Sequence, residues 1–311
     1  MKTMLITGGT VFVSRFAAKY YISQGYEVYV INRNTKPQVM GVHLIECDRH
    51  NIGNLLKKIY FDIVLDITAY NEQDVTALTE ALGGFGNYIM ISSSAVYPEY
   101  GKQPFTEDSI LAENKFWGKY GTDKIQAEHA LLKRVPNAYI LRPPYLYGPM
   151  NNVYREAFVF QCALEERPFY LPGEGTMKLQ FFHVKDLFRF IDCIIKYKPE
   201  NHIFNVGNRE TVSVKDWVYA CYHAAGKTPQ YVNVYDDIPQ RNYFSFYNYE
   251  YYLDVEKMYS LMPSTIPLEE GLTESFLWYS QNSDKVQRKP FIEYIDESCI
   301  SALKNNVLMK S

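Results

Sequence analysis

The segment TMLITGGTVFVS, residues 3–14, decides the fold of this chain. Its first residues, Thr3–Thr7, form a short apolar run of the kind found in buried strands. The glycines Gly8 and Gly9 follow at once, and aromatic residues then recur at every fourth position from Phe12 to Tyr20, which is the spacing of one helix face. The order strand, glycine turn, helix predicts the start of a parallel sheet whose strands are connected by helices.

Short apolar runs alternate with segments of helical period through the first half of the chain. Strands are predicted at Thr3–Thr7, Glu27–Ile31, His43–Cys47, Asp62–Ile67, Tyr88–Ser92 and Ala138–Leu141. This alternation is typical of parallel strands that helices cover on both faces. A later strand-like run, Ile203–Val206, and a helical segment, Val214–Ala225, look like additions to the same sheet. We therefore expect an α/β fold with a doubly wound parallel sheet of the Rossmann type.

The second half is less regular, and we expect a smaller C-terminal lobe interleaved with the sheet domain. Residues 1–165 are assigned to the Rossmann domain, to which 181–230 contribute sheet and helix. Residues 166–180 and 231–285 are assigned to a substrate-binding lobe, and 286–311 to a C-terminal tail. A short helix is expected within that tail, from Cys299 to Met309.

The composition points to an ordinary globular protein that acts on a small molecule. Hydrophobic residues make up 47% and charged residues 22% of the 311 positions, and the net charge is −3. Such a balance provides no field that attracts nucleic acid or an acidic membrane surface. No apolar run approaches the ~20 residues that span a bilayer, and the first residues do not read as a secretory leader. We expect a cytoplasmic protein with no membrane partner, and nucleic acid is disfavoured.

Neither the cysteines nor the histidines predict a metal site. The five cysteines are widely spaced, with no CxxC pair, and are expected to be free thiols in a reducing compartment. His183 stands alone between apolar residues before a predicted helix, so a structural histidine is expected there. Asp186 is interpreted as the cap of that helix.

The glycine turn lies where a dinucleotide-binding fold places the pyrophosphate of its cofactor. Gly8 and Gly9 allow a tight turn, and free amides at the start of a helix attract anions. Val11 and Ser14 stand where the usual pattern has glycine, so one Cβ lies near the pyrophosphate path and another at the helix-to-strand contact. Two-glycine turns also occur in doubly wound proteins that bind no dinucleotide, so this segment alone leaves both interpretations open. Its candidate cofactor contacts are Thr7, Gly8, Gly9, Thr10, Val11, Phe12 and Val13.

Residues at the ends of the next two strands bear on the choice of cofactor. The acidic residue that would bind the ribose of NAD is missing, and Asn32 and Arg33 stand in its place. A guanidinium there favours the 2′-phosphate of NADP, with a solvated surface arginine as the alternative. Asp48, directly after the third strand, is either an adenine contact or a turn-forming aspartate.

A phenol and an ammonium, those of Tyr120 and Lys124, stand four residues apart and hence on one face of a helix. Most pairs with this spacing are ordinary surface residues. The serine run Ser92–Ser94, however, follows the fifth predicted strand, at the carboxyl edge of the sheet where such folds bind ligands. This placement makes Ser93, Tyr120 and Lys124 candidates for one catalytic group.

These motifs, in this order, resemble the extended short-chain dehydrogenases/reductases of the NAD-dependent epimerase/dehydratase family. The resemblance covers residues 1 to about 280. It rests on Gly8-Gly9-Thr10, Ser93 with Ala95-Val96-Tyr97, Tyr120 and Lys124 with Ala127-Glu128, Leu141-Arg142-Pro143 with Tyr147-Gly148-Pro149, Phe182-His183-Val184, and Phe204-Asn205-Val206-Gly207.

The resemblance implies roles for the matching residues. Tyr120 would exchange a proton with a substrate hydroxyl or carbonyl while hydride moves to or from a nicotinamide. Lys124 would lower the pKa of that tyrosine and hold the ribose hydroxyls, and Ser93 would hydrogen-bond the reacting oxygen. A homodimer formed through two packed helices is a further expectation. The additional contacts implied are Ser94 for the substrate and Thr68 and Ala69 for the cofactor.

Two departures from the family pattern bear on the reaction. Ser94 and Ala95 stand where sugar-nucleotide dehydratases carry the Asp-Glu pair that eliminates water, so dehydration is disfavoured. The arginine that binds the substrate diphosphate in many relatives is also missing. Candidate phosphate ligands, each open to the alternative of an ordinary surface cation, are Arg155, Lys178 and Arg241.

Three functions remain open from the sequence. The favoured one is an NAD(P)-dependent epimerase or oxidoreductase acting on a sugar-type substrate, nucleotide sugars included. The altered glycine turn also resembles the chloroplast stem-loop RNA-binding branch of this superfamily, although the acidic balance and the complete serine, tyrosine and lysine group argue against RNA. A dinucleotide-sensing regulator without turnover is the third interpretation, supported by the altered turn alone.

Overall fold

A computed structural model describes residues 1–235 and 238–299 of the chain. The chain divides into two compact units, each assembled from three separate segments. Unit 1 comprises Met1–Met150, Gln180–Glu210 and Tyr252–Ile266. Unit 2 comprises Asn151–Leu179, Thr211–Tyr251 and Pro267–Ser311. The helix expected within Cys299–Met309 falls, apart from Cys299 itself, outside the described residues.

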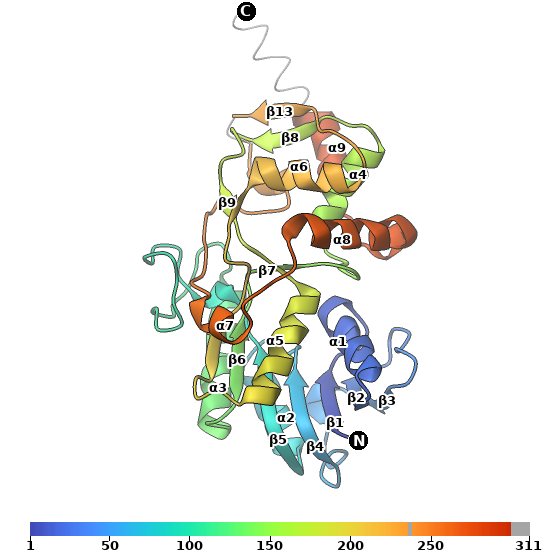
Figure 1. Ribbon diagram of the computed structural model, residues 1–311, viewed down its shortest axis with the longest axis vertical. Helices are drawn as coiled ribbons and strands as arrows, with labels where there is room; N and C mark the ends of the chain where they lie inside the picture. Colours follow the sequence, from blue (N-terminus) through green and yellow to red (C-terminus); the bar gives the residue numbers. More distant parts are fainter. Residues whose placement is uncertain (236–237, 300–311) are drawn as a thin grey trace, which may run out of the picture. The chain divides into compact units, whose positions relative to one another are not determined.

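Unit 1 is built on a seven-stranded parallel sheet in the order β11-β6-β5-β4-β1-β2-β3 (Figure 1). The order runs outward from β1 in both directions, which is the doubly wound arrangement expected from the sequence. All six predicted strands are present, Thr3–Thr7 with both ends as predicted and the other five with shifted ends, and the predicted run Ile203–Val206 joins the sheet as Ile203–Asn205. The strands are β1 (Thr3–Thr7), β2 (Glu27–Asn32), β3 (His43–Glu46), β4 (Tyr60–Asp66), β5 (Gly84–Ile91), β6 (Tyr139–Arg142) and β11 (Ile203–Asn205).

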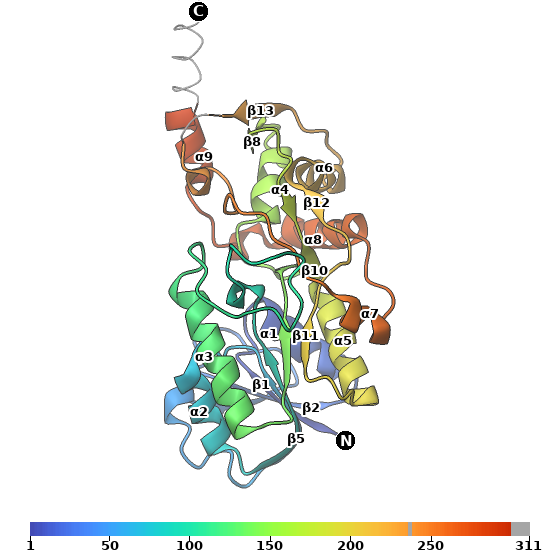
Figure 2. The ribbon, with the colours of Figure 1, turned by 90° about the vertical axis from the view of Figure 1, so that its left-hand side faces the viewer.

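Two pairs of helices cover the two faces of this sheet (Figure 2). Helices α2 (Glu72–Ala81) and α3 (Lys119–Arg134) pack against each other on one face. Helices α1 (Phe12–Ser23) and α5 (Val184–Tyr197) pack together on the other, where the rings of Phe16 and Phe188 stack with their centroids 5.6 Å apart. Because helices cover both faces, the central strands are almost wholly apolar and buried.

Short elements occupy the loops of unit 1. The 3-10 helix η1 (Arg49–Asn51) follows β3, and η2 (Ser94–Val96) follows β5. Both therefore lie at the carboxyl edge of the parallel sheet. The remaining elements are the paired strands β7 (Tyr145–Tyr147) and β10 (Phe181–His183), and the helix α7 (Glu256–Leu261).

Unit 2 is a smaller body of helices with two pairs of short strands. Helices α4 (Glu156–Leu164) and α6 (Val214–Ala224) pack on each other and on α8 (Leu268–Asn282). The other elements are β8 (Phe169–Pro172) with β13 (Tyr231–Val234), β9 (Lys178–Leu179) with β12 (Val212–Ser213), η3 (Gln240–Asn242), η4 (Ser283–Lys285), α9 (Phe291–Tyr294) and η5 (Ile295–Cys299).

The boundaries of the units differ from those expected from the sequence. Residues 151–165 and 211–230, assigned above to the Rossmann domain, belong to unit 2, because α4 and α6 bury their apolar faces against each other and α8. Residues 252–266 belong to unit 1 instead of the lobe. The described part of the expected tail also packs into unit 2, where the ring of Phe291 stacks on that of Tyr154 at 5.6 Å.

Candidate active site at the carboxyl edge of the sheet

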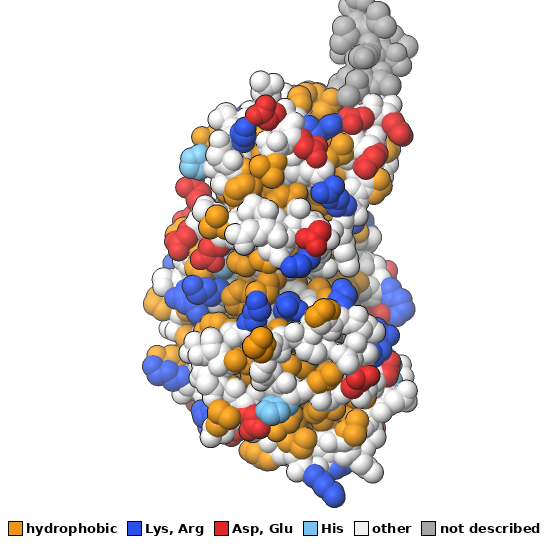
Figure 3. Space-filling view, turned by 90° about the vertical axis from the view of Figure 1, so that its right-hand side faces the viewer, with side chains coloured by type: hydrophobic (Ala, Val, Ile, Leu, Met, Phe, Trp, Pro, Cys, Tyr) orange, Lys and Arg blue, Asp and Glu red, His pale blue; other side chains and the backbone are white. Residues whose placement is uncertain are grey.

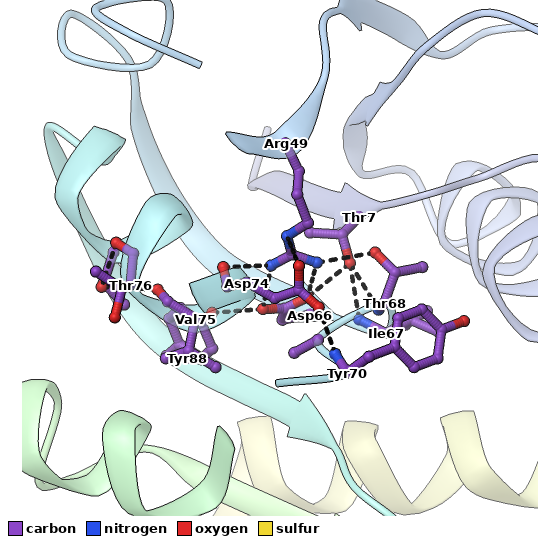
Figure 4. A network of polar contacts seen from close by, with 12 residues as sticks. Thr7, Arg49, Asp66, Ile67, Thr68, Tyr70, Asp74, Val75, Thr76 and Tyr88 are labelled. Atoms are coloured by element: carbon purple, nitrogen blue, oxygen red, sulfur yellow. Dashed lines mark hydrogen bonds and ion pairs between the residues drawn. The ribbon is translucent and has the colours of Figure 1, made fainter. Parts of the chain in front are cut away.

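A buried carboxylate, that of Asp66, is the centre of a polar network at the end of β4 (Figure 4). Asp66 is fully buried and accepts hydrogen bonds from the hydroxyls of Thr7 at 2.8 Å and Tyr88 at 2.7 Å. The guanidinium of Arg49 donates to both carboxylate oxygens, at 3.2 and 2.9 Å. Burial alone would raise the pKa of Asp66, but these partners hold it below its ordinary value. The network therefore carries a charged, fully paired carboxylate.

The same network connects the ends of neighbouring strands. Thr7 ends β1, Asp66 ends β4, and Tyr88 lies in β5. The hydroxyl oxygen of Thr7 also accepts hydrogen bonds from the backbone N–H groups of Ile67 at 2.9 Å and Thr68 at 3.0 Å. With one bond donated and two accepted, this hydroxyl is saturated. Thr7 thus fixes the segment after β4 through its hydroxyl.

The glycine turn has a backbone that only glycine adopts without strain. Gly8 and Gly9 have φ angles of +92° and +94°. A Cβ on Gly9 would lie 2.7 Å from the side chain of Val30, and one on Gly8 would lie 2.9 Å from the Oγ of Ser14. Ser14 therefore fills the space that Gly8 leaves open, which explains how a serine is accommodated at this contact. Val11, with φ −134°, has a backbone conformation that needs no glycine.

Helix α1 begins directly after this turn, at Phe12. In the described part of the chain no side chain caps this helix, whose N-cap residue is Val11. The hydroxyl of Ser14, in the first turn, donates to the carbonyl of Val11 at 2.9 Å and so accepts no hydrogen bond from a helix N–H there. The N–H groups of a first helical turn have no acceptor within the helix and carry the positive end of its dipole. Thr10, Val11, Phe12 and Val13 thus lie at the start of a helix that is suited to an anion.

The polar side chains at the ends of β2 and β3 have partners within the protein. The amide of Asn32 donates to the carbonyl of Gly8 at 2.6 Å, so it supports the glycine turn. Asp48 accepts from the N–H of His50 at 2.9 Å and caps η1, which fits the turn-forming interpretation of this residue. Arg33 follows β2 and is exposed.

Lys124 is buried beneath the same edge, at 2% exposure. Its ammonium donates to the carbonyl oxygens of Ala69 at 2.6 Å and Ile91 at 3.0 Å, and lies 5.2 Å from the centre of the Tyr70 ring. Burial lowers the pKa of Lys124 to about 8, although nearby carboxylates act in the opposite direction. Among the residues that the structure describes, these two carbonyls take two of the three N–H groups of the ammonium. The third N–H is left for a ligand.

The serine turn and helix α3 are in direct contact. A Cβ on Gly121 would lie 2.5 Å from the carbonyl oxygen of Ala95, so the missing side chain allows α3 to approach η2 closely. Tyr120, next to Gly121, is 40% exposed, and Ser93 is the N-cap of η2, with its Oγ accepting from the N–H of Ala95 at 3.2 Å. The fold therefore brings the serine turn together with the helix that carries Tyr120 and Lys124.

A buried ion pair supports this serine turn. Arg142 and Glu128 are 2% and 1% exposed, and the guanidinium donates to the carboxylate at 2.6 and 3.0 Å. The hydroxyl of Ser92 donates to the same carboxylate, and Arg142 donates to the hydroxyl of Tyr97 at 2.8 Å. Because Ser92 precedes the turn and Tyr97 ends it, the pair holds the backbone of Ser93 on both sides.

Sequence reasoning missed the side chains that hold this edge together. The sequence did indicate that Asp66 has a buried partner, since a carboxylate inside an apolar strand needs one. Nothing in the sequence identified Arg49 as that partner. Arg49 follows β3, and Asp66 lies in β4, a strand that does not pair with β3 in the sheet. Glu128 and Arg142 were noticed as part of motifs, without a role.

The candidate phosphate ligands lie in unit 2. Arg155 is the N-cap of α4, and Arg241 lies in η3 with its guanidinium 4.7 Å from the centre of the Tyr247 ring. Burial together with the charges of Arg241 and Arg155 lowers the pKa of Lys289, a third cation of unit 2 that the sequence did not suggest. Lys178 is exposed on β9.

The expected structural histidine is confirmed, and the expected helix cap is not. His183 is fully buried and caps α5 by accepting from the N–H of Lys185 at 3.4 Å, and burial lowers its pKa to about 4. Asp186 is therefore not the cap, and it accepts from the N–H of Ile266 at 2.6 Å instead.

Across residues 1–235 and 238–299 no cluster of His, Cys, Asp and Glu could hold a metal ion. The cysteines described as free are Cys47, Cys162, Cys193 and Cys221.

A pocket of about 430 Å³ lies beside the polar network, between the segment around η1 and helix α2. It lies on the flank of unit 1 and includes none of the predicted site residues, so we do not assign the chemistry to it. The described residues that line it are His50, Ile52, Gly53, Asn54, Lys57, Gln73, Thr76, Ala77, Glu80 and Ala81.

In the part of the chain that the structure describes, no helix is both long and apolar enough to cross a membrane.

The residues at the carboxyl edge fit a dinucleotide. The turn is tight, α1 starts without a side-chain cap, and Ser14 occupies space that Gly8 provides. Val11 keeps an ordinary extended backbone, and the next residue, Phe12, has a positive φ of +32°. Lys124 retains an N–H donor beside the ends of β4 and β5.

Comparisons with known proteins agree with this fold. The chain is 28% identical over 302 residues to the chloroplast stem-loop binding protein of 41 kDa b from Arabidopsis thaliana, covering 88% of this chain and 78% of the relative. It is 25% identical to the UDP-glucose 4-epimerase of Corynebacterium glutamicum, covering 72% and 80%. The crystal structure of dTDP-glucose 4,6-dehydratase from Bacillus anthracis in complex with NAD superposes with a TM-score of 0.73 at 20% identity, covering 92% of this chain and 99% of that one.

Residues 62–207, which include most of β4 and all of β5, the serine turn, α3 and β6, match the model of the NAD dependent epimerase/dehydratase family. This stretch contains the residues that the sequence analysis placed in the catalytic group. The doubly wound sheet of unit 1 is the fold of the solved structures that the chain resembles. Through residues 62–207 the chain is thus similar to the NAD dependent epimerase/dehydratase family.

Proposed function

We propose that the protein is an NAD(P)-dependent epimerase or oxidoreductase that acts on a hydroxyl or carbonyl of a sugar-type substrate, nucleotide sugars included. The observation that carries this proposal is the placement of Lys124. Its ammonium is buried, is held by two backbone carbonyls at the ends of β4 and β5, and has a pKa near 8. Tyr120 precedes it by one helical turn, at the exposed rim.

In this proposal each group of the site has one task. The start of α1 binds the pyrophosphate, and the bound nicotinamide supplies or accepts hydride. The phenol of Tyr120 gives a proton to, or takes one from, the substrate oxygen. The positive charge of Lys124 lowers the cost of the tyrosinate, and the hydroxyl of Ser93 stabilises charge on the reacting oxygen. Ser94 is proposed as a further substrate contact.

Four finer features belong to the same proposal. A preference for NADP rests on Arg33, an exposed cation at the end of β2 with no acidic residue in the usual ribose-binding position. Dehydration is disfavoured because Ser94 and Ala95 carry no carboxyl group. Arg155 and Arg241, whose charges act on Lys289, are proposed to bind a phosphate of the substrate, with Lys178 as a further candidate. A homodimer is proposed from the family resemblance.

The experiment is a substrate panel. The purified protein is incubated with UDP-, GDP- and dTDP-sugars in the presence of NAD⁺ or NADPH, while absorbance at the nicotinamide band and the stereochemistry of the products are followed. An epimerase returns the hydride and gives an inverted sugar without net absorbance change, whereas an oxidoreductase changes the absorbance in proportion to product. Cofactor uptake without any turnover across the panel would favour the dinucleotide-sensing regulator.

Nucleic-acid binding is the second candidate, and the similarity to the chloroplast stem-loop binding protein favours it. The net charge of −3 argues against it, because phosphate binding requires a basic surface. On the face in Figure 3, several basic side chains gather in a row across the middle, and acidic side chains lie above and below them. Retention of a stem-loop RNA that weakens steeply with salt, in protein that takes up no dinucleotide, would support this candidate over the enzyme.

A further inference from the structure

We propose that Arg49 is a positioning residue, whose guanidinium fixes the segment between β4 and α2 and thereby the backbone carbonyl that receives the ammonium of Lys124. The catalytic role of Lys124 rests on the proposed function, but the placement of its ammonium does not. Arg49 itself lies on η1, far along the chain from that lysine.

The guanidinium of Arg49 binds three different parts of the edge at once (Figure 4). It donates to both carboxylate oxygens of Asp66, to the hydroxyl of Thr68 at 3.0 Å and to the backbone carbonyl of Asp74 at 2.9 Å. Asp66 ends β4, Thr68 lies in the following segment, and Asp74 lies in the first turn of α2. Arg49 therefore bridges the two ends of the segment and one residue within it.

Other bonds complete the attachment of this segment. The carboxylate of Asp74 accepts from the N–H of Tyr70 at 2.7 Å, and the hydroxyl of Thr7 accepts from the N–H groups of Ile67 and Thr68. Ala69 stands between these fixed points, is fully buried, and presents its carbonyl to Lys124 at 2.6 Å. A shift of the segment would thus move the acceptor that holds the ammonium.

Charged groups on β4, α2, α3 and η1 influence the pKa of Lys124. Asp66 on β4, Asp74 on α2 and Glu128 on its own helix α3 favour its charged form, and Arg49 on η1 disfavours it. Burial is the largest influence and lowers the pKa. Loosening the segment would admit water to the ammonium and move its pKa toward the ordinary value. A substitution that keeps the charge of Arg49 separates this effect of position from the effect of charge.

The experiment follows the titration of Lys124 by NMR in the cofactor-free protein labelled with ¹³C,¹⁵N-lysine, with the resonance assigned from Lys124→Met. Arg49→Lys keeps one positive charge but cannot bind three acceptors in the geometry of a guanidinium. We expect its Lys124 midpoint to rise by about one pH unit or more, as water relieves the desolvation. Thr68→Val, a milder change that removes one acceptor of Arg49, is expected to shift the midpoint in the same direction by less, and it serves where Arg49→Lys fails to fold.

The matched control is Arg134→Lys, which makes the same substitution on α3 in an exposed pair with Glu80 at 3.0 Å. Its Lys124 midpoint is expected to stay at the wild-type value. Because the midpoint is measured in folded protein, a general loss of stability does not move it. An unchanged midpoint in both Arg49→Lys and Thr68→Val would overturn the proposal. An NADH titration of the wild type tests the proposed function separately, since the Lys124 midpoint requires no cofactor.

Discussion

The ammonium of Lys124 donates a hydrogen bond of 2.6 Å to the carbonyl oxygen of Ala69, which connects helix α3 to the segment after β4. Its second acceptor is the carbonyl of Ile91, at the end of β5. Both acceptors are neutral, so they fix the position of the ammonium without neutralising its charge. A cation held in this way can act on a phenol or a ribose hydroxyl at the rim of the sheet.

Tyr120→Phe removes the hydroxyl of the proposed proton donor and keeps its aromatic ring. Because the side chain is 40% exposed, the variant is expected to fold normally and to retain the wild-type affinity for dinucleotide. Turnover of the substrate identified by the panel is expected to fall by about 10²–10⁴-fold, the usual contribution of a positioned acid or base. Tyr100→Phe, at a residue that is 72% exposed, is the control and should behave as wild type. Turnover within twofold of wild type in Tyr120→Phe would exclude this tyrosine as the proton donor.

The depressed pKa of Lys124 predicts a specific dependence of stability on pH. Folding lowers this pKa from the ordinary 10.5 to about 8, so between these values the unfolded chain holds a proton that the folded chain has lost. The free energy of unfolding that Lys124 contributes therefore rises with pH across this window. In urea unfolding at pH 7.5 and pH 10, the wild type should gain stability relative to Lys124→Met as the pH rises. Parallel changes in the two proteins would contradict the lowered pKa.

The sheet was predictable from the sequence because buried parallel strands have to be apolar. The run Thr3–Thr7 was predicted with both ends correct, and the strand order follows from the alternation of strands and helices. The division into units was less predictable. Helices α4 and α6 have ordinary helical patterns, and only their packing partners show that they belong to unit 2.

The candidate site was only partly predictable, for a similar reason. Spacing along one helix identified Tyr120 and Lys124, since residues four apart share a face. The contacts that position them connect distant segments, as when Arg49 pairs with Asp66 or Lys124 reaches Ala69. Asn32 and Thr7 stay predictions as cofactor contacts, and their side chains also bind the protein's own backbone. Local patterns do not reveal such partners.

The buried pair of Arg142 and Glu128 is expected to be critical for folding. Arg142→Met leaves a carboxylate without its cation at a site that is 1% exposed, and this should lower the free energy of unfolding by about 3–5 kcal/mol. Arg134→Met breaks the exposed pair with Glu80 and should cost about 1 kcal/mol or less. Urea unfolding of both variants makes the comparison. Equal losses in the two variants would show that the buried pair does not support the serine turn as described.

Removal of cations in unit 2 tests the proposed phosphate contact. Arg241→Gln is expected to raise the KM of a nucleotide-sugar substrate by about tenfold while leaving kcat nearly unchanged, because a lost phosphate contact weakens binding of the ground state and the transition state alike. Arg209→Gln, which removes an exposed cation paired with Glu256 in unit 1, is the matched control. Kinetics of the two variants on the same substrate decide the point. A fall in kcat with no change in KM would show that Arg241 does not bind the substrate phosphate.

Dinucleotide binding at the glycine turn is the claim on which the enzyme interpretation depends, and calorimetric titration of the protein with NAD⁺ and NADP⁺ measures it directly. We expect one equivalent of dinucleotide to bind the wild type, and binding to be lost in Gly9→Ala, where a Cβ would lie 2.7 Å from Val30 on a backbone with φ +94°. Circular dichroism of Gly9→Ala confirms that the variant is folded. Absence of binding of either dinucleotide to the wild type, or equal binding to folded Gly9→Ala, would contradict a cofactor site at this turn.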